Sequence, residues 1–170
     1  MDGAETLASW DCDSFIDLNR NVQGRGQIQS FSMRFLIALL ALAGAVVSYM
    51  ALRVHYSTDT QPCSINEKWD CGIVNHSPYA VIGPVPVAAI GIAGYVVIAA
   101  LALARRRRLL VGAAILGLAF SLYLTHIEKD LLMVWCLYCV ISLGMISAIT
   151  LLSVGWAVAG RWSRGSATAA

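Results

Sequence analysis

The sequence Trp135-Cys136-Leu137-Tyr138-Cys139 lies near the start of the last apolar part of the chain. Residues 131–160 carry no charged side chain. About 20 such residues span a bilayer as a helix, so this run is long enough for a tilted transmembrane helix with an interfacial lead-in. Residues three apart on a helix share a face, which makes Cys136 and Cys139 neighbours at membrane depth. A C-x-x-C pair is typical of the vicinal dithiol of redox proteins.

The composition is that of a membrane protein. Of the 170 residues, 58% are hydrophobic and only 13% are charged, whereas soluble domains carry about 25% charged residues. The net charge is +2 and no basic stripe with interleaved aromatic residues is present, so we predict no nucleic-acid partner. The length allows one membrane domain with short tails.

The apolar stretches predict an all-α membrane protein, a bundle of four transmembrane helices. The predicted spans are residues 35–52, 80–104, 109–127 and a last span within 131–160. Pro84 and Pro86 are placed in the first turns of the second helix, where proline is tolerated. Asp130 is a candidate N-cap for the fourth helix. The second helix also carries a face of small residues for close helix packing: Ala88, Ala89, Gly91, Ala93 and Gly94.

Three parts are expected along the chain. Residues 1–32 form a polar tail that is predicted to be disordered, because chain ends rich in polar residues often are. Residues 33–162 form the four-helix transmembrane catalytic domain, and residues 163–170 form a second disordered tail. Cys12 falls in the first tail and is interpreted as a spare thiol.

The distribution of lysine and arginine predicts the orientation in the membrane. One side of the predicted spans carries nine arginines: Arg20, Arg25, Arg34, Arg105, Arg106, Arg107, Arg108, Arg161 and Arg164. The other side carries Arg53, Lys68 and Lys129. Both termini are therefore expected on the cytoplasmic side of the cytoplasmic (inner) membrane. The loop between the first and second helices is expected to be extracytoplasmic.

Four of the five cysteines form two close pairs on the same predicted side. Cys63 and Cys71 lie in the extracytoplasmic loop, where disulfides persist. Cys136 is expected about two turns into the fourth helix, at its outward end. Thiol–disulfide exchange moves two electrons, so the pairs can act in relay if the loop brings Cys71 to Cys136. Cys63 would then face the partner, and Cys139, one turn deeper, would meet an acceptor dissolved in lipid.

The cysteines also allow other interpretations. The C-x-x-C pair could be two small buried residues in an apolar helix. A zinc site could use all four paired cysteines, although the x7 spacing of the loop pair is atypical for zinc. Haem attachment is disfavoured because Val140, not histidine, follows Cys139. His76 could raise the thiolate character of Cys71, or be a solvated loop histidine.

The chain resembles the bacterial homologues of vitamin K epoxide reductase over residues 33–162. The resemblance rests on the ordered motif C-x7-C-x5-S-x-Y-x3-G-x2-P-x4-G, followed by W-C-x-x-C. The residues that carry it are Cys63, Cys71, Ser77, Tyr79, Gly83, Pro86, Gly91, Trp135, Cys136 and Cys139.

The resemblance implies a four-helix bundle around a quinone, with the loop across its outward mouth. It implies a quinone-dependent thiol–disulfide oxidoreductase that reoxidises a thioredoxin-like protein and so supports disulfide bond formation. Cys63 would take the partner's electrons, Cys71 would relay them to Cys136, and Cys139 would react with the quinone. The implied quinone-binding residues are Ser77, Tyr79, Pro86, Val87 and Leu143.

The resemblance also implies an electron acceptor and a protein partner. The electron acceptor would be ubiquinone or menaquinone (vitamin K), with no metal, and the partner a separate thioredoxin-like (DsbA-like) extracytoplasmic protein. Val87 and Leu143 stand near positions where the animal enzymes have an asparagine and a tyrosine that contact the quinone. The alternatives are a quinone or vitamin K epoxide reductase, with electron flow judged from the quinone side, and a non-enzymatic cysteine-rich or metal-binding membrane protein.

Overall fold

The computed structural model describes residues 31–57, 66 and 68–165, with the side chains of 160–165 left out. Cys12, Cys63 and nearly all of the predicted N-terminal tail lie outside the described residues. Among the described residues, three helices are long and apolar enough to cross a membrane: Phe31–Tyr56, Arg107–Leu132 and Leu137–Ala159. A fourth apolar helix, α3 (Val87–Leu103), has 17 residues. The chain is therefore a mostly helical, multi-pass membrane protein.

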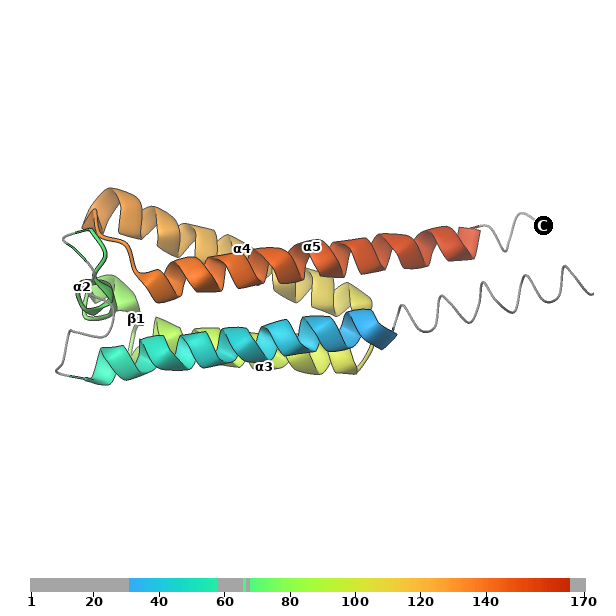
Figure 1. The fold of residues 1–170 in the computed structure, drawn as a ribbon, viewed down its shortest axis with the longest axis horizontal. Helices are drawn as coiled ribbons and strands as arrows, with labels where there is room; N and C mark the ends of the chain where they lie inside the picture. Colours follow the sequence, from blue (N-terminus) through green and yellow to red (C-terminus); the bar gives the residue numbers. More distant parts are fainter. Residues whose placement is uncertain (1–30, 58–65, 67, 166–170) are drawn as a thin grey trace, which may run out of the picture. The chain divides into compact units, whose positions relative to one another are not determined.

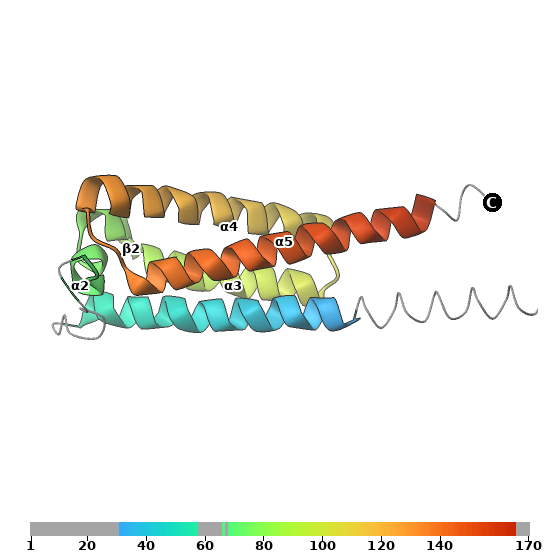
Figure 2. The same cartoon turned by 45° about the horizontal axis from the view of Figure 1, so that its top comes forward.

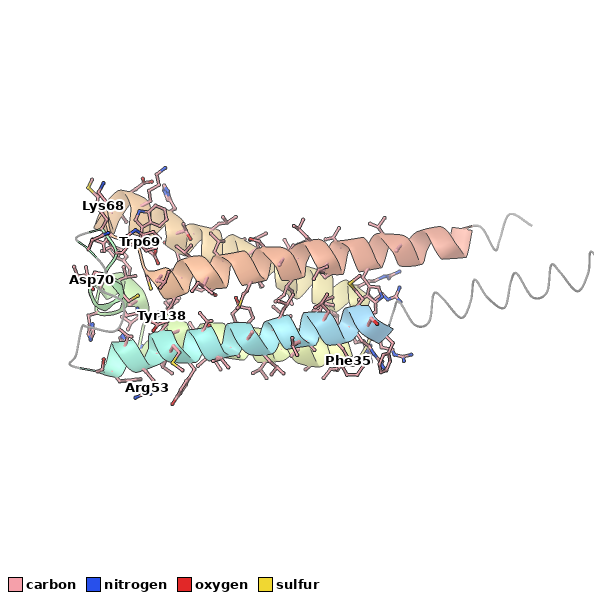
Figure 3. All side chains as sticks on the ribbon, in the orientation of Figure 1. Phe35, Arg53, Lys68, Trp69, Asp70 and Tyr138 are labelled. Carbon is pink, nitrogen blue, oxygen red and sulfur yellow. The ribbon has the colours of Figure 1, made fainter. Side chains whose placement is uncertain are left out.

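The first helix, Phe31–Tyr56, contains the predicted span 35–52 and extends beyond it at both ends. Phe35 and Arg53 lie toward its two ends, and Arg53 is at the end nearest loop residues 68–70 (Figure 3). Beyond Tyr56, the Ser57 N–H still donates to the Arg53 carbonyl at 3.0 Å. The flanking arginines therefore lie within the helix and do not terminate it.

The second apolar helix starts later than predicted, at Val87 instead of residue 80. The preceding residues form a 3-10 turn, η2 (Pro78–Ala80), and an antiparallel hairpin of β1 (Val81–Ile82) and β2 (Val85–Pro86). Gly83 turns the hairpin with φ +61°, a conformation that glycine adopts readily. The prediction that Pro84 and Pro86 lie inside the helix is wrong, because Pro84 is in the hairpin turn and Pro86 is the extended N-cap.

The third helix, α4 (Arg107–Ile127), continues into one π-helical turn, η3 (Glu128–Leu132). The fourth, α5, runs over Leu137–Gly165, so the tail predicted to start at 163 is helical as far as Gly165. Met133, with φ 53°, separates η3 from α5. The prediction that Asp130 caps the fourth helix is wrong. Its carboxylate instead pairs with His126 Nδ1 at 2.6 Å, one turn back on the same helix.

The helices of residues 34–165 pack side by side, and α5 lies along α4 (Figures 1 and 2). Tyr95 of α3 joins three of them. Its hydroxyl donates to the Ser142 carbonyl of α5 at 2.9 Å, and a Cβ at Gly44 in the first helix would overlap its ring. A buried tyrosine needs such a hydrogen bond, because an unpaired hydroxyl in an apolar interior is costly.

The loop segment after residue 67 packs over the start of α5. It contains the short helix α2 (Cys71–Asn75), whose N-cap Asp70 accepts the Ile73 N–H at 3.0 Å. The Trp135 N–H donates to the Lys68 carbonyl at 2.8 Å, and the Asp70 N–H donates to the Trp135 carbonyl at 3.1 Å. Figure 3 shows the three loop side chains 68–70 gathered at this end of the helices.

Candidate thiol redox site

Cys136 stands at the N-terminus of α5. The Val140 N–H donates to the Cys136 carbonyl at 3.1 Å, so Cys136 is the N-cap and Cys139 lies in the first helical turn. The prediction that Cys136 lies two turns inside the fourth helix is wrong. The left-handed Met133 and the pairing of Trp135 with the loop keep residues 133–136 out of the helix. Unpaired N–H groups at such an end favour an anionic sulfur.

The surroundings of Cys136 lower the pKa of its thiol below the ordinary value. The largest cause is a hydrogen bond with the Cys139 side chain, and the backbone N–H groups of Cys139 and Tyr138 contribute in the same direction. Burial and the charge of Glu128 oppose the shift. These hydrogen bonds therefore favour ionisation of Cys136, although its side chain is 0% exposed.

Asn75 connects the loop cysteine to this thiol. It is buried at the end of α2, and its Nδ2 donates to the Cys71 carbonyl at 2.8 Å and lies 3.7 Å from Cys136 Sγ. Cys71 and Cys136 are both buried in one apolar cluster with Val54 and Val74. Sequence reasoning missed Asn75. Its only signal is a position four residues after Cys71, which puts both on one face of a helix.

The described cysteines are in different redox states. Cys71 is disulfide-bonded, whereas Cys136 and Cys139 are free thiols. An oxidised loop cysteine therefore lies in the same buried cluster as a reduced dithiol, which is the juxtaposition that thiol–disulfide exchange requires. In this state the Cys71 sulfur is in a disulfide and is not available as a thiolate ligand, so the structure does not support a zinc site made of all four paired cysteines.

Glu128 is a carboxylate buried beside the pair, and sequence reasoning missed it as part of a polar turn. It is 3% exposed, its Oε2 accepts the Cys136 N–H at 3.2 Å, and its side chain is hydrogen-bonded with Cys139. One carboxylate oxygen and the two sulfurs lie within 4.8 Å of one another. Three such donors can also bind a thiophilic metal ion, although structural zinc sites use four.

Cys139 lines a cavity of about 650 Å³ between the first helix, α3, α4 and α5. Its walls are mainly apolar, and the small residues Ala88, Gly91 and Gly94 of α3 leave room for it. Tyr138, which Figure 3 labels near the start of α5, also lines it. Ligand sites of this kind commonly enclose about 300–1,000 Å³, so the space fits a quinone head group.

The cavity contains three of the five predicted quinone-binding residues. Ser77, Tyr79 and Val87 line it, whereas Pro86 and Leu143 are not among the lining residues. The Ser77 hydroxyl already donates to the Val74 carbonyl at 2.8 Å. Contact of any of these residues with a quinone stays a prediction.

His76 is part of the framework that holds α2. Its Nδ1 lies 2.8 Å from the Gly72 carbonyl oxygen and its Nε2 lies 3.2 Å from that of Ser57. The ring of His55 stacks on it at 6.1 Å and lies 2.6 Å from the Asn75 carbonyl through Nδ1. His76 is exposed, as expected for a loop histidine, but it links the end of the first helix to α2.

A comparison with curated proteins found no match. The profile of the vitamin K epoxide reductase family, in contrast, matches residues 35–154. The match covers more than half of the chain and includes the loop cysteines, Glu128 and the C-x-x-C pair. The chain therefore belongs to the vitamin K epoxide reductase family.

Proposed function

We propose that this protein is a membrane thiol–disulfide oxidoreductase that reoxidises a thioredoxin-like protein and transfers the electrons to a quinone. Membership of the family supports oxidoreductase chemistry in a membrane. One observation carries the more specific proposal. The C-x-x-C pair has one sulfur, Cys136, buried against the loop segment and the other, Cys139, on the wall of an apolar cavity.

Electrons enter at the loop. The reduced partner attacks a loop disulfide between Cys63 and Cys71 and leaves oxidised, so both loop cysteines become thiols. Cys71 then attacks Cys136 of the oxidised C-x-x-C pair, and Cys139 leaves as a thiolate that takes up a proton to become a thiol. Cys63 resolves the mixed disulfide by attacking Cys71, which releases Cys136. Asn75 supports this step because its amide contacts both the Cys71 carbonyl and the Cys136 sulfur.

Electrons leave at the cavity. A bound quinone accepts two electrons and two protons, while Cys136 and Cys139 lose both and form a disulfide. Ser77, Tyr79 and Val87 are the proposed quinone contacts because they line the same cavity as Cys139. Tyr95 and Ser142, whose side chains are hydrogen-bonded to each other, add polar groups to a wall in which Val87 is apolar.

The proposed topology has four spans, with both termini on the cytoplasmic side and the loop cysteines outside. The bias of nine against three basic residues supports this orientation. Helix α3 has 17 residues, a rise of about 25 Å, against a hydrocarbon core of about 30 Å. The apolar hairpin before Val87 would span the remaining thickness of the hydrocarbon core.

The proposal is tested with the purified chain in detergent, a reduced thioredoxin-like protein and a soluble ubiquinone or menaquinone analogue. Loss of quinone absorbance should follow oxidation of the partner one for one, and should require Cys63, Cys71, Cys136 and Cys139. Cys12→Ser is the matched control and should react at the wild-type rate. Quinone reduction that persists in Cys139→Ser would contradict the proposal. Electron flow only in the reverse direction, from a quinol to the oxidised partner, would also contradict it.

A further inference from the structure

The position of Glu128 has no structural need for a charge. Its carboxylate accepts one backbone N–H, from Cys136, and shares a hydrogen bond with the Cys139 side chain. A glutamine would accept the same N–H without the cost of removing a charge from water. A buried carboxyl held against two reactive sulfurs therefore points to a group that exchanges a proton.

Glu128 also faces the space where the oxidant would bind. Glu128 and Cys139 line the same cavity, while Glu128 is only 3% exposed. The next two residues of the turn, Lys129 and Asp130, are exposed. A proton on Glu128 therefore has a short path to a molecule in the cavity.

We infer that Glu128 is the catalytic base that takes the proton of the Cys139 thiol during oxidation of the pair and gives it to the reduced quinone. This inference rests on the proposed function. The Cys139 S–H bond breaks as the proton moves to the carboxylate, and the sulfur can then lose electrons. The Cys136–Cys139 disulfide forms, two electrons pass to the quinone, and the proton moves from Glu128 to a quinol oxygen.

Both protons that the quinone takes up are accounted for. The second quinol proton comes from water, because Cys136 has already released its own proton to water as the thiolate. Glu128 ends in the charge state in which it began. Cys136 and Cys139 are hydrogen-bonded to Glu128, and Tyr79, Tyr95 and Tyr138 line the same cavity. His126, Lys129 and Asp130 lie within two residues of Glu128 along the chain and are exposed.

The test is a single turnover. The wild-type chain is reduced, freed of reductant and mixed with a quinone analogue, and the oxidation rate of the C-x-x-C pair is followed across a range of pH. Glu128→Gln should react about 10²-fold more slowly near neutral pH, a typical contribution of a general base. The deficit should shrink as the pH rises, because the Cys139 thiol then ionises without a base. Glu128→Asp should retain more of the rate than Glu128→Gln.

The control is Asp130→Asn, which removes an exposed carboxylate of the same turn that pairs with the His126 ring. It should react like the wild type. Quinone binding by Glu128→Gln, measured by quenching of tryptophan fluorescence, should be unchanged. A wild-type rate in Glu128→Gln, or an equal loss at every pH with weakened binding, would overturn the inference. If the wild type itself does not reduce quinone, the proposed function fails instead.

Discussion

The side-chain amide nitrogen of Asn75 lies 3.7 Å from the sulfur of Cys136 and donates to the Cys71 carbonyl at 2.8 Å. One buried side chain thus touches both redox segments, which are far apart in the sequence. An amide donor near a sulfur stabilises the thiolate, because hydrogen bonding to a charged form favours it.

Replacement of Asn75 by alanine should weaken the contact between the loop and the start of α5. We expect Asn75→Ala to lose about 1–3 kcal/mol of stability, because a buried hydrogen bond is lost and a void remains. Reduction of the C-x-x-C pair by the loop should also slow. Thermal unfolding in detergent and stopped-flow exchange measure the two effects. Asn66→Ala removes an exposed hydrogen bond in the same loop, which its Oδ1 accepts from the Lys68 N–H at 3.0 Å, and should cost less because water can replace it. Equal behaviour of the two variants would contradict the assignment.

The lowered pKa of Cys136 predicts a thiolate at a pH where an ordinary thiol is still protonated. Cys139→Ala removes the hydrogen-bond donor and should raise the pKa of Cys136, whereas Cys139→Ser keeps a donor and should raise it less. The thiolate ultraviolet absorbance, titrated in chains that lack the other three cysteines, gives these values.

The same shift has a consequence for stability. Because the folded pKa is depressed, the thiolate stabilises the fold above the unfolded pKa of Cys136. This contribution is lost as the pH falls through the folded value. Identical titrations for both Cys139 variants would show that the sulfur–sulfur hydrogen bond does not set the pKa.

Tyr95 and Gly44 should govern the packing of the bundle. Gly44→Ala forces a methyl group against the Tyr95 ring and should cost about 1–3 kcal/mol, as overpacking usually does. Gly112→Ala is the matched control, because a Cβ there meets no atom within 4 Å. It should stabilise the helix by about 0.5–1 kcal/mol. Thermal unfolding measures both changes, and an equal response of the two variants would contradict this role of Gly44.

The apolar pattern predicted that four helices exist but not where two of them begin. Hydropathy cannot distinguish an extended apolar segment from a helical one, so residues 133–136 were indistinguishable from the helix that follows. Contact with the distant Trp69 and a left-handed Met133 decide that boundary. The start of α3 had a local signal in Gly83, which lies between Val81-Ile82 and Val85-Pro86, but prolines are also acceptable in the first turn of a helix.

The cysteine pairs were visible from spacing alone, whereas their neighbours were not. Asn75 and Glu128 carry no motif, and each reaches the Cys136 region only through tertiary contacts across the chain or across a break in the helix. Glu128 looked like part of a solvated turn because Lys129 and Asp130 follow it. The π-helical turn turns those two outward and leaves Glu128 buried.

The proposed orientation predicts which cysteines can be reached from outside the cell. A membrane-impermeant thiol reagent, applied to reduced intact cells, should label the loop pair but not Cys12. Because Cys71 is 1% exposed, the label should fall mainly on Cys63. Permeabilised cells provide the control, in which Cys12 should also react. Labelling of Cys12 alone from outside would reverse the topology.

The relay from Cys71 to Cys136 passes through a mixed disulfide of the two cysteines, which can be trapped. In Cys63→Ser/Cys139→Ser, neither resolving thiol is present, so oxidised glutathione should join Cys71 to Cys136. Their Cα atoms must approach within about 7 Å, which the shared buried cluster favours. Trypsin cuts between them at the arginine turn 105–108, and non-reducing mass analysis then shows whether the two pieces stay joined.

Cys71→Ser/Cys139→Ser is the parallel control, in which Cys63 should join Cys136 far less. We expect pieces joined through Cys71 and Cys136 in the first variant and mostly separate pieces in the second. Separate pieces in both variants, or equal joining in both, would contradict the relay.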